Sequence, residues 1–183
     1  MLGKVKTRLA VTVGNARALQ VYRQLLNITR IASLGVDCQR QLYYSSAIEQ
    51  DDAWPNVFFE KHRQVGADLG ARMHHAFSTS FAEGATTAVL IGSDCPEISA
   101  ALISTAFDTL ESHDIVLGPA EDGGYYLIGM KTVNISLFEN MKWSNASVLE
   151  DTLARVSKLG LHVKMLPQLS DLDNEQDLLT SGL

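Results

Sequence analysis

The sequence predicts an α/β protein, a three-layer α/β/α sandwich around a mostly parallel mixed sheet. Short apolar runs alternate along the chain with longer segments in which apolar residues recur every three or four positions. This alternation is typical of strands connected by helices. It is clearest over 88–130, where the apolar runs 88–91 and 115–117 enclose a segment over 99–112 with helical spacing.

Composition favours one soluble domain over residues 1–183. No apolar run approaches the roughly 20 residues of a membrane helix, and the basic N-terminus lacks the apolar core of a secretory signal. We therefore expect no membrane span, a cytoplasmic location and free thiols at Cys38 and Cys95. A net charge of −6 argues against non-specific binding to nucleic acid.

The first half of the chain predicts two amphipathic helices and short strands. Apolar residues at helical spacing predict a helix over 14–34 that Gly35 ends. A strand is expected over 38–45 and another short one over 57–59. The four-residue repeat from Leu69 to Phe81 predicts a second helix, on which Asp68 and Arg72 would form a surface ion pair.

The second half adds strands over 125–130 and 161–166, with helices between and after them. Ser147 and Glu150 have the spacing of a capping box, which predicts a helix that Gly160 ends. An acidic turn over 171–177 precedes a short last helix.

Acidic residues follow three of the strand-like segments, at Asp94, at Asp122 and at Asp173. Ligands of open α/β sheets bind outside the carboxyl ends of the strands. Carboxylates there can bind a metal, accept a proton or bind a hydroxyl group. Asp94 and Asp173 could together hold Mg²⁺, although Asp94 could equally well only cap the turn that follows it.

Two further stretches have both a functional and a structural interpretation. The basic segment with Lys4, Lys6 and Arg8 could bind phosphates, or it could be a solvated tail. The glycines after Asp122, Gly123 and Gly124, would let the backbone approach a ligand, but Asp-Gly-Gly is also common in hairpins. The chain has no dinucleotide-binding glycine fingerprint, no phosphate-binding P-loop motif and no nucleophile elbow.

Taken together, the motifs resemble a known family. They are GKVKTRL over 3–9, QVGADLGARM over 64–73, IGSDCP over 91–96, GPAEDGGYYLIG over 118–129, WS over 143–144 and DLD over 171–173. The sequence resembles the bacterial GT-A-like transferases known as radical-SAM/selenodomain-associated transferases. These belong to the nucleotide-diphospho-sugar transferase superfamily, which has a Rossmann-like fold.

The resemblance implies roles for individual residues. It implies that Lys4, Lys6 and Arg8 face the phosphates of a nucleotide or nucleotide-sugar donor, and that Asp94 and Asp173 bind Mg²⁺ or Mn²⁺. It also implies that Asp122 is the catalytic residue on the side of an unknown small-molecule acceptor. Ser93, Gly123 and Gly124 are then candidates for substrate binding.

One departure from the family pattern lies at the N-terminus. Members begin with an apolar strand before the GKVKTRL motif, whereas here only Met1 and Leu2 precede Gly3. The strand would be a central one, next to the strand that carries Asp94. We therefore expect a rearranged N-terminus or a second chain over the gap, and a homodimer is one form that this could take.

Two functions remain open from the sequence. The first is a metal-dependent transferase that transfers either a sugar or a nucleotidyl group. The second is a non-catalytic nucleotide-binding or assembly protein with the same fold, which the short N-terminus favours and the retained acidic loops oppose.

Overall fold

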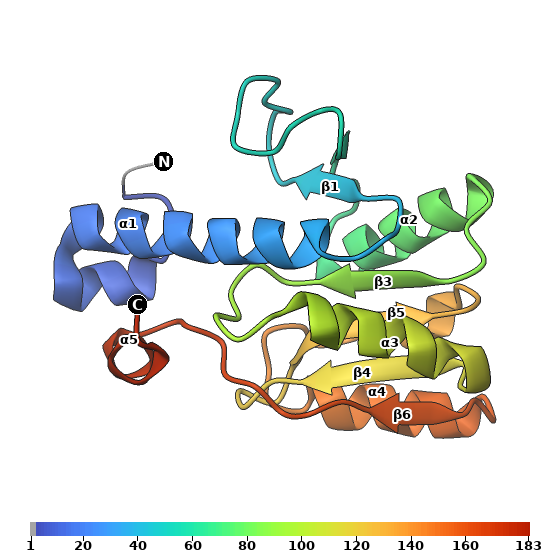
Figure 1. Ribbon diagram of the computed structural model, residues 1–183. Coiled ribbons are helices and arrows are strands. Elements are labelled where there is room, and N and C mark those ends of the chain that lie inside the picture. Colours follow the sequence, from blue (N-terminus) through green and yellow to red (C-terminus); the bar gives the residue numbers. More distant parts are fainter. Residues whose placement is uncertain (1–2) are drawn as a thin grey trace.

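A computed structural model describes residues 3–183; Met1 and Leu2 lie outside the described residues. Its main sheet has four strands in the order β3-β5-β4-β6 (Figure 1). The strands are β3 (Ala88–Ile91), β4 (Ile115–Pro119), β5 (Tyr125–Met130) and β6 (Val163–Met165). β6 is parallel to β4, and β5 is antiparallel to both β3 and β4. Three of the four strands therefore share one direction, and the predicted mixed α/β sheet is confirmed.

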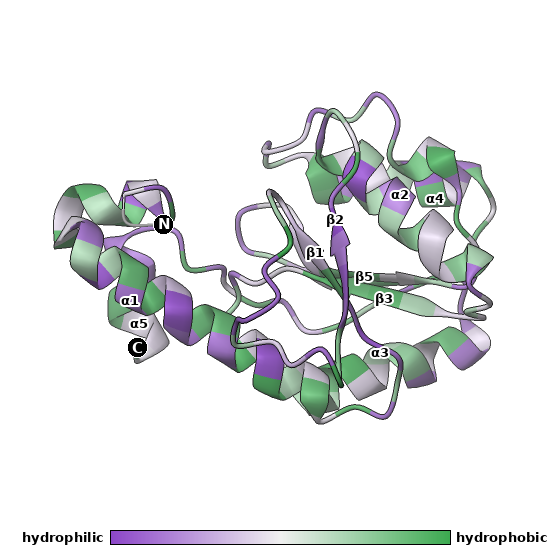
Figure 2. Ribbon diagram, turned by 90° about the horizontal axis from the view of Figure 1, so that it is seen from above, coloured by the Kyte–Doolittle hydropathy of each residue, from purple (hydrophilic) through white to green (hydrophobic). Residues whose placement is uncertain are grey.

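Helices cover both faces of this sheet, as the three-layer prediction requires (Figure 2). One face carries α1 (Thr7–Leu34) and α3 (Ala100–Ser112), and the other carries α2 (Leu69–Ala82) and α4 (Val148–Lys158). The alternation of strand side chains divides the core between the faces. Val116 packs with α3, whereas its neighbours Ile115 and Leu117 pack with α2 and α4.

Helix α1 is longer than the sequence predicts. It begins at Thr7 and bends at Gly14, where φ is 80° and the backbone is not helical. The predicted segment over 14–34 is thus the second part of α1, and Gly35 ends it as expected. The first part packs against α5 (Glu175–Ser181), away from the sheet (Figure 1). This packing brings Lys6 and Asp173 beside Asp94, just beyond the carboxyl end of β3.

A small parallel sheet, β1 (Gln41–Tyr44) and β2 (Glu60–Arg63), stands apart from the main sheet. Among the described residues β3 pairs only with β5. The amide of Gly92 donates to Tyr126, so the alternation of an antiparallel ladder turns the backbone groups of Val89 and Ile91 away from β5. They face a cavity of about 1550 Å³ that residues of both β1 and β3 line.

We call this space the β1–β3 cavity. Helix residues close its two sides, among them Met73 and Phe77 of α2 and Ile103 and Phe107 of α3. It lies beside β3, where the family resemblance predicts a further strand. The expectation of a rearranged N-terminus or of a second chain over this edge stays a prediction.

Three local predictions are wrong. Residues 56–58 form a turn in which Val57 and Phe58 are exposed, and the strand begins only at Glu60, as β2. Asp68 makes no ion pair with Arg72, because its carboxylate accepts the backbone N–H of Ala71 and caps α2.

The capping box at Ser147 is absent as well, since the Ser147 hydroxyl donates to Asp151 instead of accepting a helix amide. A capping box does form at Asn174 and Asp177, at the start of α5. Among residues 3–183, no helix is long and apolar enough to cross a membrane.

Candidate functional site

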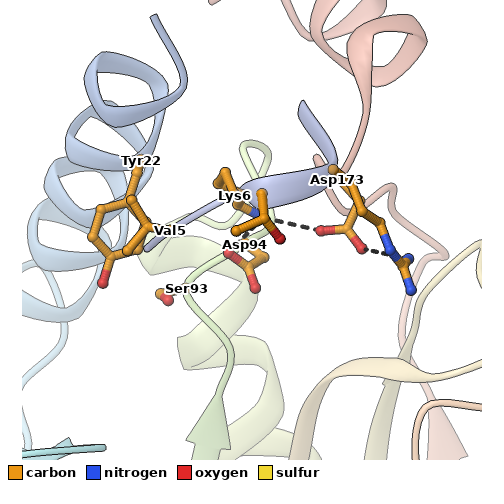
Figure 3. Close-up of a pocket in the computed structure, with 8 residues that line it drawn as sticks. Val5, Lys6, Tyr22, Ser93, Asp94 and Asp173 are labelled. Carbon is orange, nitrogen blue, oxygen red and sulfur yellow. Dashed lines mark hydrogen bonds and ion pairs between the residues drawn. The ribbon is translucent and has the colours of Figure 1, made fainter. Parts of the chain in front are cut away.

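A cavity of about 320 Å³ lies at the carboxyl end of β3, where this strand meets the start of α1 (Figure 3). Pockets of a few hundred Å³ are typical of small-molecule sites. We call it the site cavity. Its lining combines the basic segment with the first and last acidic loops: Val5, Lys6, Thr7, Arg8, Tyr22, Ser93, Asp94 and Asp173.

Lys6 is the centre of this arrangement. Its ammonium lies 2.7 Å from Oδ1 of Asp94 and 3.1 Å from Oδ1 of Asp173 (Figure 3). It also donates to the backbone carbonyl of Leu172 over 2.6 Å. Only 6% of the Lys6 side chain is exposed, against about half of each carboxylate. The interpretation of this segment as a solvated tail is therefore wrong for Lys6.

The first turn of α1 faces the same cavity. Ala10 donates to the carbonyl of Lys6, so the amides of the three residues before it precede the first helical hydrogen bond. These amides and the helix dipole favour an anion. Arg8 lies beside them with 81% of its side chain exposed, and one of its nitrogens is 3.6 Å from Asp173. Lys4 is exposed and does not line the site cavity.

Tyr22, which lies within the helix predicted over 14–34, is a site residue that the sequence did not single out. Its ring lies beside Val5 and Ser93 in Figure 3. Burial, and then the charge of Asp94, raise the pKa of its hydroxyl above the ordinary value of 10.0, so it stays neutral at physiological pH. The helical spacing of apolar residues includes Tyr22 and gives no sign that its ring reaches the cavity.

Asp122, Gly123 and Gly124 form the turn between β4 and β5, outside the lining of the site cavity. Oδ1 of Asp122 accepts the N–H of Gly124 over 2.8 Å, which fixes the direction of the carboxylate. Gly123 has φ of 88°, and a Cβ there would lie 2.1 Å from the carbonyl oxygen of Ala146. The hairpin interpretation of this stretch is thus confirmed. A role of these residues in substrate binding or catalysis stays a prediction.

Asp171 lies within the range of the charges of Asp122, Asp94 and Asp173. Burial is the largest cause that raises its pKa to about 6, and the charges of Asp122, Asp94 and Asp173 act in the same direction. The sequence analysis noted Asp171 in the last acidic loop but chose Asp173 as the site residue. Only the fold shows that the charges of the other three carboxylates act on Asp171.

The residues present do not fit a divalent cation between Asp94 and Asp173, because Lys6 already holds Oδ1 of both. Within the described chain, no group of three His, Cys, Asp or Glu side chains is arranged to hold a metal ion. The expected Mg²⁺ or Mn²⁺ therefore stays a prediction, and it requires that Lys6 leave these oxygens.

Comparison with solved structures defines the class of protein. The chain is similar to a protein of Desulfovibrio desulfuricans G20 described as a "putative nucleotide-diphospho-sugar transferase". The TM-score is 0.90 and the sequence identity is 34%, over 97% of this chain and 80% of that one. The chain thus has the nucleotide-diphospho-sugar transferase fold, as the resemblance implied.

The particular family follows from residues 30–145, which match the profile described as "Uncharacterized protein conserved in bacteria (DUF2064)". The chain belongs to this family. A comparison with curated proteins found no match.

Proposed function

We propose that the protein is a transferase whose donor is a nucleotide-diphospho-sugar or a nucleotide, bound by its phosphates in the site cavity. The observation that carries the proposal is that the first turn of α1, with the Arg8 side chain that it bears, lines the site cavity. Helix amides and a guanidinium are the groups that proteins use for phosphate oxygens. The fold shared with the protein described as a "putative nucleotide-diphospho-sugar transferase" supports the same donor class.

The acceptor side of this proposal is the turn with Asp122. This carboxylate follows β4 as Asp94 follows β3, and their strands run in the same direction. The charges of Asp122 and of Asp94 both raise the pKa of Asp171. The loop after β3 and the loop after β4 therefore border one region. An acceptor hydroxyl there could transfer its proton to Asp122 as a general base.

The protein's own cations would stabilise negative charge on the leaving phosphate. The α1 amides are fixed before the donor arrives, which is the condition for electrostatic stabilisation of a transition state. Arg8, whose side chain is 81% exposed, would add positive charge beside them. The resemblance also implies a divalent cation at these phosphates, but Lys6 occupies the carboxylates that would hold it. Mg²⁺ or Mn²⁺ is part of the proposal only if Lys6 gives up Asp94 and Asp173.

Nucleotide binding is the first test. Nucleoside diphosphates and nucleotide-sugars of each base are added to the protein, with and without Mn²⁺, and thermal unfolding is followed. A ligand at 100 times its Kd stabilises a protein by about 2.7 kcal/mol, which raises the Tm of a chain of this size by about 5–10 °C. No shift with any nucleotide would contradict the proposal.

Arg8→Ala should weaken binding of the effective nucleotide about tenfold or more, because a hydrogen bond to a charged group contributes about 1.5–3 kcal/mol. Lys158→Ala is a matched control that removes one cation at the far end of α4, and it should leave the affinity unchanged. Equal loss in both variants would indicate a general charge effect instead of a phosphate site.

The products separate the two reaction types. Sugar transfer breaks the bond between the anomeric carbon and the diphosphate and releases a nucleoside diphosphate. Nucleotidyl transfer from a nucleoside triphosphate breaks a bond between two phosphates and releases pyrophosphate. Binding without either product, over a broad set of acceptors, would favour the alternative of a non-catalytic nucleotide-binding protein.

A further inference from the structure

The ammonium of Lys6 uses its full bonding capacity. A lysine has three N–H donors and no acceptor, and here three oxygens surround the nitrogen. They belong to the carboxylates of Asp94 and Asp173 and to the carbonyl of Leu172, all within 3.1 Å. Because only 6% of the Lys6 side chain is exposed, this is not a solvated surface ion pair.

The backbone is shaped to place Lys6 there. Lys6 has φ of 46° and ψ of 48°, in the left-handed region that lysine seldom adopts. A residue in that region is strained, and surrounding structure must hold it. The first turn of α1 and the packing of Leu9 against Leu172 supply that structure.

The backbone that carries each of the two carboxylates is held as well. The N–H of Leu172 donates to the carbonyl of Asp94 over 2.9 Å, which joins the first acidic loop to the last. The N–H of Asp173 donates to Asp177, so the start of α5 fixes this residue as well. Lys6 therefore sits in a site built from three separate parts of the chain.

An oxygen-lined position between two carboxylates is also what a hard divalent cation requires. An ammonium and a divalent cation cannot share the same oxygens, because like charges at that distance repel strongly. We infer that Lys6 is the resident cation of this site: in the donor-free protein its ammonium occupies the position between Asp94 and Asp173 and keeps Mg²⁺ and Mn²⁺ out.

The inference concerns the same site as the proposed function, but it does not depend on which donor binds. It assigns Lys6 a positioning role, since its ammonium holds the two carboxylates 2.7 and 3.1 Å from one nitrogen.

The test is a titration with Mn²⁺ alone, with no nucleotide present, in which free Mn²⁺ is measured by electron paramagnetic resonance. Four proteins are compared: wild type, Lys6→Met, Lys6→Arg and Lys4→Met. Met keeps the length of the side chain without its charge, and Arg keeps the charge. Lys4 is an exposed lysine of the same segment and serves as the matched control.

Lys6→Met should bind one Mn²⁺ at least about tenfold more tightly than wild type, a difference of about 1.4 kcal/mol. Lys6→Arg and Lys4→Met should bind as weakly as wild type. Adding Asp94→Asn to Lys6→Met should remove the new site, because one of its two carboxylates is then neutral. A purely structural role for Lys6 would give no gain in Mn²⁺ affinity.

Two results would overturn the inference. One is a folded Lys6→Met variant, checked by circular dichroism, that binds Mn²⁺ no better than wild type. The other is wild-type protein that binds one Mn²⁺ at micromolar concentration and loses it on Asp94→Asn. The second measurement needs no Lys6 variant, so it can overturn the inference even if Lys6→Met does not fold. Because no nucleotide is used, a failure of the proposed function is seen separately in the nucleotide titration.

Discussion

The backbone N–H of Leu172 donates to the backbone carbonyl of Asp94 over 2.9 Å, and this single bond brings the last acidic loop against the first. Leu172 is fully buried beneath α1 and α5. The two residues that flank it, Asp171 and Asp173, are thereby placed beside Asp94. The concentration of negative charge at the site thus rests on this bond between the two loops and on the burial of Leu172.

The first prediction concerns Asp171. Its folded-state pKa of about 6 lies above the ordinary value of 3.8, mainly through burial. The folded protein therefore binds more protons than the unfolded chain between about pH 4 and pH 6, so this group lowers stability as the pH rises through that window. Replacing the carboxylate by an amide should relieve the loss at neutral pH.

We expect Asp171→Asn to stabilise the protein at pH 7.5, because it removes a charge whose burial is unfavourable. The gain should be only about 1 kcal/mol, since water reaches part of the carboxyl and screens its charge. That is about 2–4 °C in Tm for a chain of this size. At pH 4 the gain should vanish. Thermal unfolding of both proteins at four pH values gives the difference, and a difference independent of pH would contradict the prediction.

The second prediction concerns the start of α2. Because Asp68 accepts the N–H of Ala71 over 2.8 Å, Asp68→Ala should destabilise the protein by about 1 kcal/mol. Asp68→Asn keeps an oxygen that can accept this bond and should cost much less. Urea denaturation measures both variants. If the ion pair with Arg72 were the important contact, Asn and Ala would be equally damaging.

The third prediction compares two adjacent glycines. A Cβ at Gly123 would meet the backbone of Ala146 at 2.1 Å, and φ is 88°, so Gly123→Ala must displace the loop that leads into α4. We expect a loss on the order of 2 kcal/mol or more. At Gly124 the nearest atom is Oδ1 of Asp122, at 3.2 Å, and φ is not in the left-handed region.

Gly124→Ala is therefore the matched control, and it should cost less than half as much in the same urea experiment. Equal effects would mean that the close approach of residue 146 to the turn is not what requires a glycine. Nucleotide affinity can be measured on both variants, which separates damage to the turn from a part in substrate binding.

The fourth prediction concerns the open edge of β3. Its backbone groups at Val89 and Ile91 face the β1–β3 cavity, and unpaired strand edges favour pairing with another chain. If a second chain covers this edge, the protein should associate as its concentration is raised. Sedimentation velocity measures this directly.

Val89→Pro removes an N–H that faces the cavity and leaves the ladder to β5 intact, so it should shift the protein toward the monomer. Leu90→Pro removes an N–H that faces β5 and should instead destabilise the fold, since proline in a paired strand breaks the ladder. A wild-type protein that sediments as a monomer at every concentration would rule out the second chain.

Much of the fold could be predicted because it depends on local pattern. Apolar alternation and turn residues gave β3, α3, β4 and β5 within one or two residues of their observed bounds. The strand predicted over 57–59 was wrong because an apolar run does not by itself specify a pairing partner, and the residues that pair with β1 are the polar ones that follow it, Glu60–Arg63. The ion pair of Asp68 failed because a helix amide competes for the same carboxylate.

The stretch over 88–130 was sufficient by itself to predict two parallel strands that carry Asp94 and Asp122 to one edge of a sheet. The basic segment and the late acidic turn were visible too, as separate features. What only the tertiary structure decided is which charges meet. The left-handed backbone of Lys6 and the buried Leu172 place an ammonium between Asp94 and Asp173, and such distances arise from packing between segments that no local pattern connects.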